Sequence, residues 1–227
     1  MRPSVQLALP FQGTWLAQNT PARRVPSHGT TLFGQAYAID FVAVEGGRSA
    51  SVHDWRAAFG VEPAERFFGF GRPILAPAPA LVLATHDGEP DHEARRSPLT
   101  LLHYALTQRA RLRQGLGAVA GNHVILALGD DGPYVVVVHL RKGSLSVGTG
   151  DVVTTGQQLA LCGNSGNSTQ PHVHIQAMDA ADPETASGLP IAFRRYRAWP
   201  RGGSQPRDVS VGIPGPGEIV EPLATGR

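Results

Sequence analysis

The stretch that decides the fold runs from Gly156 to Ala177 and reads GQQLALCGNSGNSTQPHVHIQA. It sets a loop rich in Gly, Asn and Ser directly before an alternating segment that carries His172 and His174. Side chains two residues apart in a strand point to the same face, so we expect both imidazoles on one sheet surface, with Val173 and Ile175 on the other. Two histidines aimed at one place favour a metal or proton-transfer site. The alternative is a polar strand edge with two incidental histidines.

The loop and the short strands before it form an ordered series of motifs. The series is Gly150-Asp151-Val152-Val153, Gly156-Gln157, Gly163-Asn164-Ser165-Gly166 and Pro171-His172-Val173-His174. It resembles the lysostaphin/LytM-type zinc endopeptidases, which cut peptide bonds of bacterial peptidoglycan. The resemblance implies a mainly β fold, a two-layer antiparallel β-sheet sandwich with an open groove for a peptide. It also implies a zinc-dependent hydrolase whose substrate is a peptide or peptidoglycan.

Composition agrees with a β-rich chain of one main domain. The 227 residues are 41% hydrophobic but only 7% aromatic, and 27 Gly and 19 Pro indicate many turns between short strands. A net charge of +2 is no nucleic-acid signature. The single cysteine, Cys162, excludes an intramolecular disulfide framework and is predicted to be a small buried hydrophobe.

No signal peptide or membrane-spanning segment is visible in the sequence, which on its own predicts a cytoplasmic protein. The resemblance instead implies a protein of the cell envelope or a secreted one. These two expectations conflict, and the sequence does not decide between them.

We expect three regions along the chain. Residues 1–36 hold loops and a strand near Gly13–Leu16 at the sheet edge, and residues 37–179 form the peptidase domain. Within that domain, residues 91–120 are predicted to be an insertion with a helix at Leu99–Leu112, where apolar residues follow a helical period. Residues 180–227 form a C-terminal extension in which Ile191–Trp199 is a strand and Gly202–Arg227 is poorly ordered or draped over the surface.

Asp40 is the first candidate metal ligand. It lies in the β-branched and aromatic run Tyr37-Ala38-Ile39-Asp40-Phe41-Val42, where a carboxylate is costly unless it is paired or bound to a metal. It aligns with the aspartate of the family's His-x-x-x-Asp motif, but the position four residues before it is Ala36. Catalytic zinc usually has three protein ligands plus water. The resemblance implies Asp40 and His174, and we predict His28 from the preceding loop as the third; a solvent-exposed turn residue is the alternative for His28.

Two further histidines are implied to act on protons near the zinc. His172 opens the His-x-His pair, and His139 ends the run Tyr134-Val135-Val136-Val137-Val138-His139-Leu140, which resembles the family's Tyr-x-His-Leu element with Val137 in place of the tyrosine. The resemblance implies that one of them takes a proton from the attacking water and the other assists the oxyanion or the leaving amine. The sequence leaves open which of them plays which part.

Two other functions remain as alternatives. Ala36 favours a catalytically degenerate LytM-like regulator of cell-wall hydrolases, which keeps the groove without the metal. A histidine phosphocarrier on a similar β fold would use two nearby histidines and need neither zinc nor Asp40.

Overall fold

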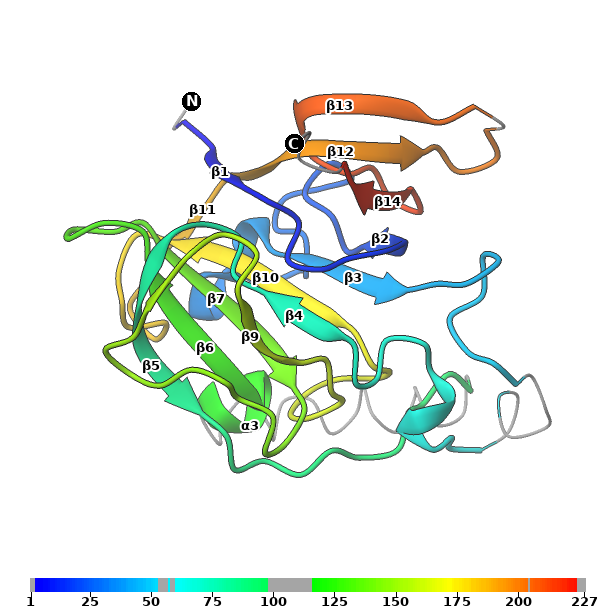
Figure 1. Cartoon of the computed structure of the whole chain (residues 1–227), viewed down its shortest axis with the longest axis horizontal. Helices are drawn as coiled ribbons and strands as arrows, with labels where there is room; N and C mark the ends of the chain where they lie inside the picture. The colour runs from blue at the N-terminus through cyan, green and yellow to red at the C-terminus, as the bar shows by residue number, and fades with distance from the viewer. Residues whose placement is uncertain (1–2, 53–56, 58–59, 98–115, 204, 224–227) are drawn as a thin grey trace.

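The computed structural model describes residues 3–223 except 53–56, 58–59, 98–115 and 204 (Figure 1). Strands dominate it, which confirms the prediction of a mainly β fold. The helical elements described are two short 3₁₀ helices, η1 (Leu32–Tyr37) and η2 (Ala64–Arg66), and α3 (Leu116–Ala120). The strands are β1 (Val5–Leu7), β2 (Trp15–Gln18), β3 (Ile39–Ala43), β4 (Pro73–Leu75), β5 (Ala80–His86), β6 (Asn122–Ala127), β7 (Tyr134–Leu140), β8 (Val152–Val153), β9 (Gln158–Leu161), β10 (Val173–Met178), β11 (Gly188–Leu189), β12 (Ile191–Trp199), β13 (Arg207–Gly212) and β14 (Ile219–Pro222).

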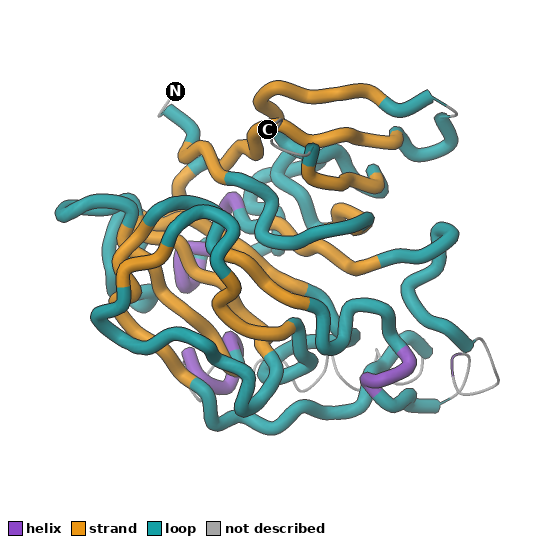
Figure 2. The backbone as a smooth tube through the Cα atoms, in the orientation of Figure 1, coloured by secondary structure: helices purple, strands orange, loops and turns teal. Residues whose placement is uncertain are grey.

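Twelve of these strands form one sheet, in the order β1-β12-β14-β2-β3-β10-β7-β6-β5-β8, with β11 beside β10 and β13 beside β12. All of its pairings are antiparallel except that of β1 with β12, which is parallel. Strands β4 and β9 form a second sheet of two strands. Figure 2 shows this small sheet lying across the strands at the centre of the large one.

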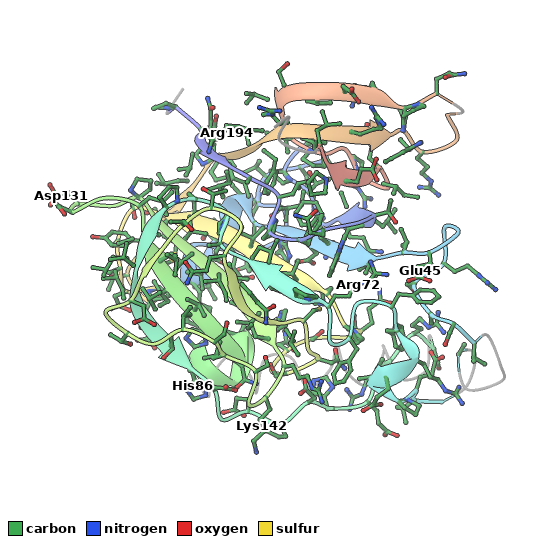
Figure 3. All side chains as sticks on the ribbon, viewed as in Figure 1. Glu45, Arg72, His86, Asp131, Lys142 and Arg194 are labelled. Carbon is green, nitrogen blue, oxygen red and sulfur yellow. The ribbon has the colours of Figure 1, made fainter. Side chains whose placement is uncertain are left out.

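The main hydrophobic core lies between the two sheets. It joins Val137 and Ile175 of the large sheet to Ile74 and Leu159 of the small one, and all four are fully buried. Charged side chains such as Asp131, Lys142 and Arg194 lie at the periphery and point outward (Figure 3). Because one face of the large sheet is closed by this core, polar residues of its central strands have only the other face on which to gather.

The central strands follow their sequence patterns. The valine-rich run of β7 and the segment Asn122–Ala127 of β6 pair as an antiparallel hairpin, joined through residues 128–133. In β10, Val173, Ile175 and Ala177 belong to the main core, while Met178 packs in a separate cluster on the opposite face. The predicted alternation therefore holds along the strand that follows the Gly/Asn/Ser loop.

The predicted insertion at residues 91–120 is described only at its ends. The predicted helix Leu99–Leu112 lies entirely within 98–115, outside the described residues. Within the described part of the chain, none of the helices has the length and apolar content that crossing a bilayer requires.

Two expectations for the chain ends were wrong. The N-terminal strand β2 lies inside the sheet between β14 and β3, not at its edge. The segment after Gly202 is not loosely draped, because β13 pairs with β12 and β14 bridges β12 and β2, with Val220 fully buried. The density of Pro and Gly there concealed both strands, and one partner of β14, strand β2, lies near the other end of the sequence.

Candidate metal centre

Asp40 and His174 face each other across two neighbouring strands. They are register partners in the antiparallel pair β3–β10, and His174 Nδ1 lies 2.9 Å from Asp40 Oδ1. In β3, Ile39 and Phe41 point into the core, so Asp40 points to the opposite face, the one that also carries His174. Both side chains are buried, with exposed fractions of 8% and 7%.

His28 reaches the same carboxylate from a loop. We call residues 19–30 the His28 loop; it precedes η1 and begins at Asn19, which has a positive φ of 44°. His28 Nε2 lies 3.1 Å from Asp40 Oδ2, and the Asn19 amide donates to the same oxygen over 2.7 Å. One ligand atom each from His28, Asp40 and His174 lies within 4.8 Å of the other two.

Gln176 sets the protonation of His174. Its Nε2 donates to the carbonyl of Phe33 over 2.5 Å, so its Oε1 faces His174 Nε2 at 3.0 Å as an acceptor. His174 must therefore carry a proton on Nε2, which leaves the Nδ1 lone pair of the neutral ring facing the Asp40 carboxylate.

Ser27 has the same effect on His28. The Ser27 hydroxyl donates to the carbonyl of Gln35 at 3.3 Å, so it accepts the Nδ1 proton of His28 at 3.0 Å. The Nε2 lone pair of neutral His28 then faces Asp40. Two nitrogen lone pairs and a carboxylate thus converge, and such a set of acceptors requires a cation between them, either a proton or a metal ion.

The dimensions of this cluster fit zinc. Nitrogen and oxygen ligands lie at about 2.0–2.2 Å from a tetrahedral zinc ion, which places neighbouring ligand atoms roughly 3.3–3.6 Å apart. The separations of 2.9 and 3.1 Å from the histidine nitrogens to Asp40 are slightly shorter than this value, and one ligand atom from each of the three residues lies within 4.8 Å of the other two. Two imidazoles and one carboxylate are also a donor set that catalytic zinc uses. A polar acceptor on the second nitrogen of each histidine is usual around such metals.

His172 stands beside this cluster, at the end of the loop that leads into β10. Its Nδ1 donates to the carbonyl of Gln170 over 2.8 Å and lies 3.1 Å from the Ser168 hydroxyl. When the ring is neutral, Nε2 therefore carries the lone pair, and it lies 3.6 Å from Asp40 Oδ1. His172 and His174 share the face that the alternation predicts.

His139 reaches the same place through a β-bulge. Val136 and Val138 line the cavity while Val137 lies in the core, so strict alternation would send residue 139 into the core. The register of β6 with β7 shifts between Asn122 and Val124, and His139 has a φ of 63°. The bulge turns His139 into the cavity and Leu140 into the core. Its ring lies 4.7 Å from the ring of His172.

The environment of the cluster shifts the pKa values of Asp40 and His139. Without a metal ion, protons take the place of the cation between these rings and Asp40. Burial then pushes the pKa of Asp40 upward, but the charges of His28 and His172 and hydrogen bonds from His174 and His28 hold this pKa well below its usual value. Burial, together with repulsion from His172 and His174, lowers the pKa of His139 well below its usual value. At neutral pH Asp40 is therefore a carboxylate, and His139 is a neutral ring whose Nδ1 donates to the carbonyl of Ser165 over 2.9 Å.

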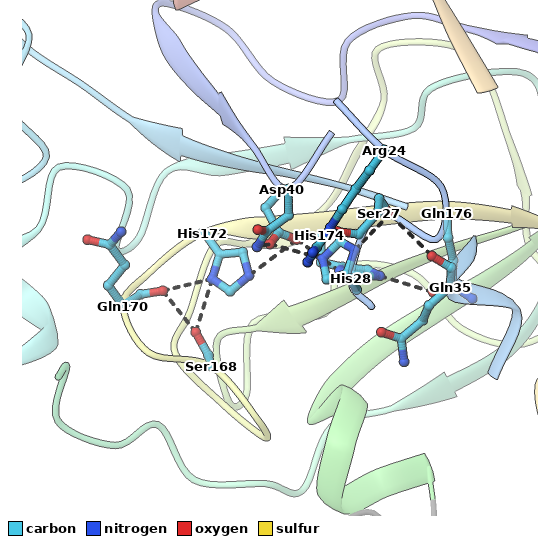
Figure 4. A network of polar contacts seen from close by, with 11 residues as sticks. Arg24, Ser27, His28, Gln35, Asp40, Ser168, Gln170, His172, His174 and Gln176 are labelled. Atoms are coloured by element: carbon cyan, nitrogen blue, oxygen red, sulfur yellow. Dashed lines mark hydrogen bonds and ion pairs between the residues drawn. The ribbon is translucent and has the colours of Figure 1, made fainter. Parts of the chain in front are cut away.

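All five residues predicted from the sequence line one cavity of about 550 Å³. Figure 4 shows His28, Asp40, His172 and His174 pointing toward one another beneath the His28 loop. Ala36 is not among the described lining residues; it lies in η1, where Gly188 of β11 packs so closely that a Cβ at 188 would stand 3.2 Å from Ala36 Cβ.

Three supporting residues were missed by sequence reasoning: Asn19, Ser27 and Gln176. Gln176 continues the alternation of His172 and His174, so the face of β10 offered a signal for it. Asn19 and Ser27 lie in a segment of turns, where no periodicity shows which side chains point inward.

Residues 107–185 match the model of "Peptidase family M23". Among solved structures, the chain is similar to the catalytic domain of a mutant of the prophage-encoded M23 protein EnpA from Enterococcus faecalis, with 20% identity over 67% of this chain and 73% of that one and a TM-score of 0.39. It is also similar to the catalytic domain of the antimicrobial peptidase lysostaphin from Staphylococcus simulans, with 17% identity, coverages of 68% and 77% and a TM-score of 0.38.

The matched segment contains His139, His172 and His174 and the loop between them. The resemblance drawn from the motifs is thereby confirmed. Over residues 107–185 this chain is thus similar to peptidase family M23.

Proposed function

We propose that this protein is a zinc-dependent endopeptidase that hydrolyses peptide bonds, with peptidoglycan cross-links as the substrate that its family indicates. The observation that carries the proposal is the convergence of His28 Nε2, Asp40 and His174 Nδ1, each nitrogen with its lone pair turned toward the carboxylate. His28 thus takes the place that Ala36 leaves without a ligand. A substrate of this kind lies in the cell envelope, where we expect the protein to act.

Zinc, when bound there, acts as a Lewis acid toward the scissile carbonyl and makes hydroxide available near neutral pH. Asp40, His28 and His174 hold the ion, and Asn19, Ser27 and Gln176 hold these ligands in position. Burial of the cluster excludes bulk water from the ligand side.

His172 is the general base in this proposal. Its Nε2 lone pair faces the cavity near Asp40 Oδ1, and its Nδ1–H is fixed on the Gln170 carbonyl, so the ring cannot turn the lone pair away without losing that bond. It accepts the proton of the attacking water.

His139 delivers to the leaving amine the proton that His172 took from the water; this proton passes from His172 Nε2 to His139 Nε2 and then to the amine nitrogen. Its ring is adjacent to that of His172, and its lowered pKa makes the protonated ring a strong donor that does not keep its proton. The carbonyl of Ser165 keeps Nδ1 protonated, so Nε2 is the nitrogen through which the proton passes.

The test is hydrolysis of purified peptidoglycan, measured by the release of new amino groups. We expect release by zinc-loaded protein, loss of release after chelation, recovery on adding zinc, and loss in Asp40→Ala. His86→Gln, at a histidine whose side chain is 42% exposed and does not line the cavity, is the control for histidine replacement. Protein that binds zinc but releases no amine from peptidoglycan or from synthetic peptides would favour the regulator, and labile phosphohistidine on zinc-free protein would favour the phosphocarrier.

A further inference from the structure

Arg24 is a cation at the cavity for which the metal cluster has no use. It lies in the His28 loop and lines the cavity that holds His28, Asp40 and His174. Its Nε donates to the carbonyl of Ser27 over 3.4 Å, and Ser27 in turn contacts His28 Nδ1. Figure 4 shows the side chain extending from the loop toward the metal ligands. Arg24 is therefore connected to the proposed metal ligand His28 through Ser27 alone.

The guanidinium of Arg24 has no carboxylate partner among the described residues. The ion pairs found there join Asp40 to histidines and the other acidic groups to other arginines or to His86, and the Arg24 side chain remains exposed. Its Nη2 points toward Gly29, where a Cβ would stand 3.8 Å away. Arginine presents its donors as a planar fork that matches a carboxylate, so its free edge at the cavity is suited to an anionic group.

The charge of the cavity points the same way. Among the described lining residues, Asp40 is the sole carboxylate and Arg24 the sole permanent cation. A divalent ion on Asp40 leaves that cluster with a surplus of positive charge, to which Arg24 adds. Such a cavity attracts substrates that carry negative charge close to the bond being cut.

The opposite wall is apolar. Val136 and Val138 of β7 and Val119 and Ala120 at α3 line the cavity on the far side of β10 from β3. The His28 loop covers the β3 side, as Figure 4 shows, with β7 and α3 below it. A peptide crossing the metal cluster therefore meets Arg24 on one side and small apolar side chains on the other.

We propose that Arg24 binds a carboxylate of the substrate peptide next to the scissile bond, so that the substrates are acidic peptides and not neutral ones such as oligoglycine. This inference rests on the peptidase function proposed above. The carboxylate is either the C-terminal one of the peptide or a side-chain one within it, since both present the same two oxygens to the guanidinium.

The experiment compares three acetylated peptides of equal length with Arg24 variants. The first is tetra-alanine with a free C-terminal carboxylate, the second is its C-terminal amide, and the third is the amide with one alanine beside the central bond replaced by glutamate. Each is made with L- and with D-residues, so that stereochemistry does not decide the result. The readouts are kcat/KM of the zinc-loaded protein and the affinity of metal-free protein measured by calorimetry.

In the wild type we expect at least one acid to exceed the neutral amide by about 10- to 100-fold, the value of a charge-assisted hydrogen bond to a carboxylate. The acid that gains identifies the source of the carboxylate. In Arg24→Gln the ratio of acid to amide falls toward one, and in Arg24→Lys it falls only in part. Arg23→Gln, which removes a neighbouring exposed arginine outside the cavity lining, keeps the wild-type ratio.

If Arg24 had a merely structural role through Ser27, Arg24→Gln would lower kcat/KM for the acid and the amide equally. The ratio of acid to amide would then stay unchanged, which would overturn the inference. Equal treatment of acid and amide by the wild type would overturn it as well. Hydrolysis without preference leaves the peptidase standing and removes the role of Arg24. Preferential binding of acids without hydrolysis of any peptide would instead keep the role of Arg24 and remove the peptidase.

Discussion

At the scale of single residues, Gln176 decides which nitrogen of His174 is free. Its amide nitrogen donates to the Phe33 carbonyl, and its amide oxygen accepts the Nε2 proton of His174. The lone pair on His174 Nδ1 therefore depends on a side chain that is not itself a proposed metal ligand. Removing a hydrogen-bond partner of this kind commonly lowers metal affinity by about 10- to 100-fold.

Replacing Gln176 by leucine should therefore weaken zinc binding. We expect about a 10- to 100-fold loss of affinity in Gln176→Leu, because His174 loses its acceptor and the neutral ring can carry its proton on either nitrogen. Competition with a chromophoric chelator measures the affinity. Gln158→Leu, at an exposed position of β9, should bind as the wild type does, and equal affinities of the two variants would contradict the role given to Gln176.

His123 is a second buried imidazole, and it makes the stability of the protein depend on pH. Burial lowers its pKa despite a hydrogen bond to the Gly121 carbonyl, and the nearby His86 lowers it further. Its pKa in the folded state is therefore below the unfolded value of about 6.5, so this contribution to stability is present above that pH and is lost as the pH falls below it.

The measurement is the midpoint of urea unfolding of metal-free protein at several pH values between 8 and 5. The wild type should lose stability below pH 6.5, with a smaller loss in His123→Gln at the same pH values. An identical dependence in both proteins would show that His123 does not contribute.

At the scale of elements, the loop 163–170 holds His139 in place against the turn before β6. Ser165 accepts the Nδ1 proton of His139 through its carbonyl, and its hydroxyl bonds to Asn122 N and to the Leu140 carbonyl. Gly121, with a φ of 61°, lies so close that a Cβ there would stand 2.5 Å from Ser165 Oγ.

The variant Gly121→Ala should displace this loop. Strain from the positive φ costs about 1–2 kcal/mol, and the clash should add about 1–3 kcal/mol. Gly143→Ala is matched to it, since Gly143 has a φ of 69° and nothing within 4 Å of its Cβ position. We expect Gly121→Ala to lose more stability than Gly143→Ala and to lower kcat as well; equal losses without a change in kcat would contradict the account.

At the scale of the whole molecule, the two ends of the chain complete the large sheet together. Strand β14 lies between β12 and β2, and β2 in turn pairs with β3, which carries Asp40. The C-terminal strands are therefore part of the support of the metal centre and not an appendage to it.

Two valines measure this contribution. Val220 of β14 is fully buried, whereas Val211 of β13 is 47% exposed. Removing two buried carbons in Val220→Ala should lower the free energy of unfolding by about 1.5–3 kcal/mol, whereas Val211→Ala should change it by less than about 0.5 kcal/mol. Chemical denaturation checks both, and a negligible effect of Val220→Ala would mean that β14 is not packed as described.

The sequence predicted the centre of the fold better than its ends. The alternation around His172 and His174 and the buried carboxylate of Asp40 follow from the period of a strand, so they could be identified without a structure. His139 came from the family resemblance, because a bulge reverses the side to which alternation would send it. His28 could be proposed only as a replacement for Ala36, since a turn segment carries no periodicity. Strands β13 and β14 were missed because their surroundings are rich in Pro and Gly, and because β2, one of the two partners of β14, is distant in the sequence.

The most direct test of the account is diffraction from zinc-loaded crystals on both sides of the zinc absorption edge, which locates the ion and its ligands. The account predicts one ion bound by His28 Nε2, the Asp40 carboxylate and His174 Nδ1, with the side facing His172 and His139 open to solvent. An ion bound by His172 or His139 while His28 points away, or zinc-loaded crystals with no ion at Asp40, would contradict it.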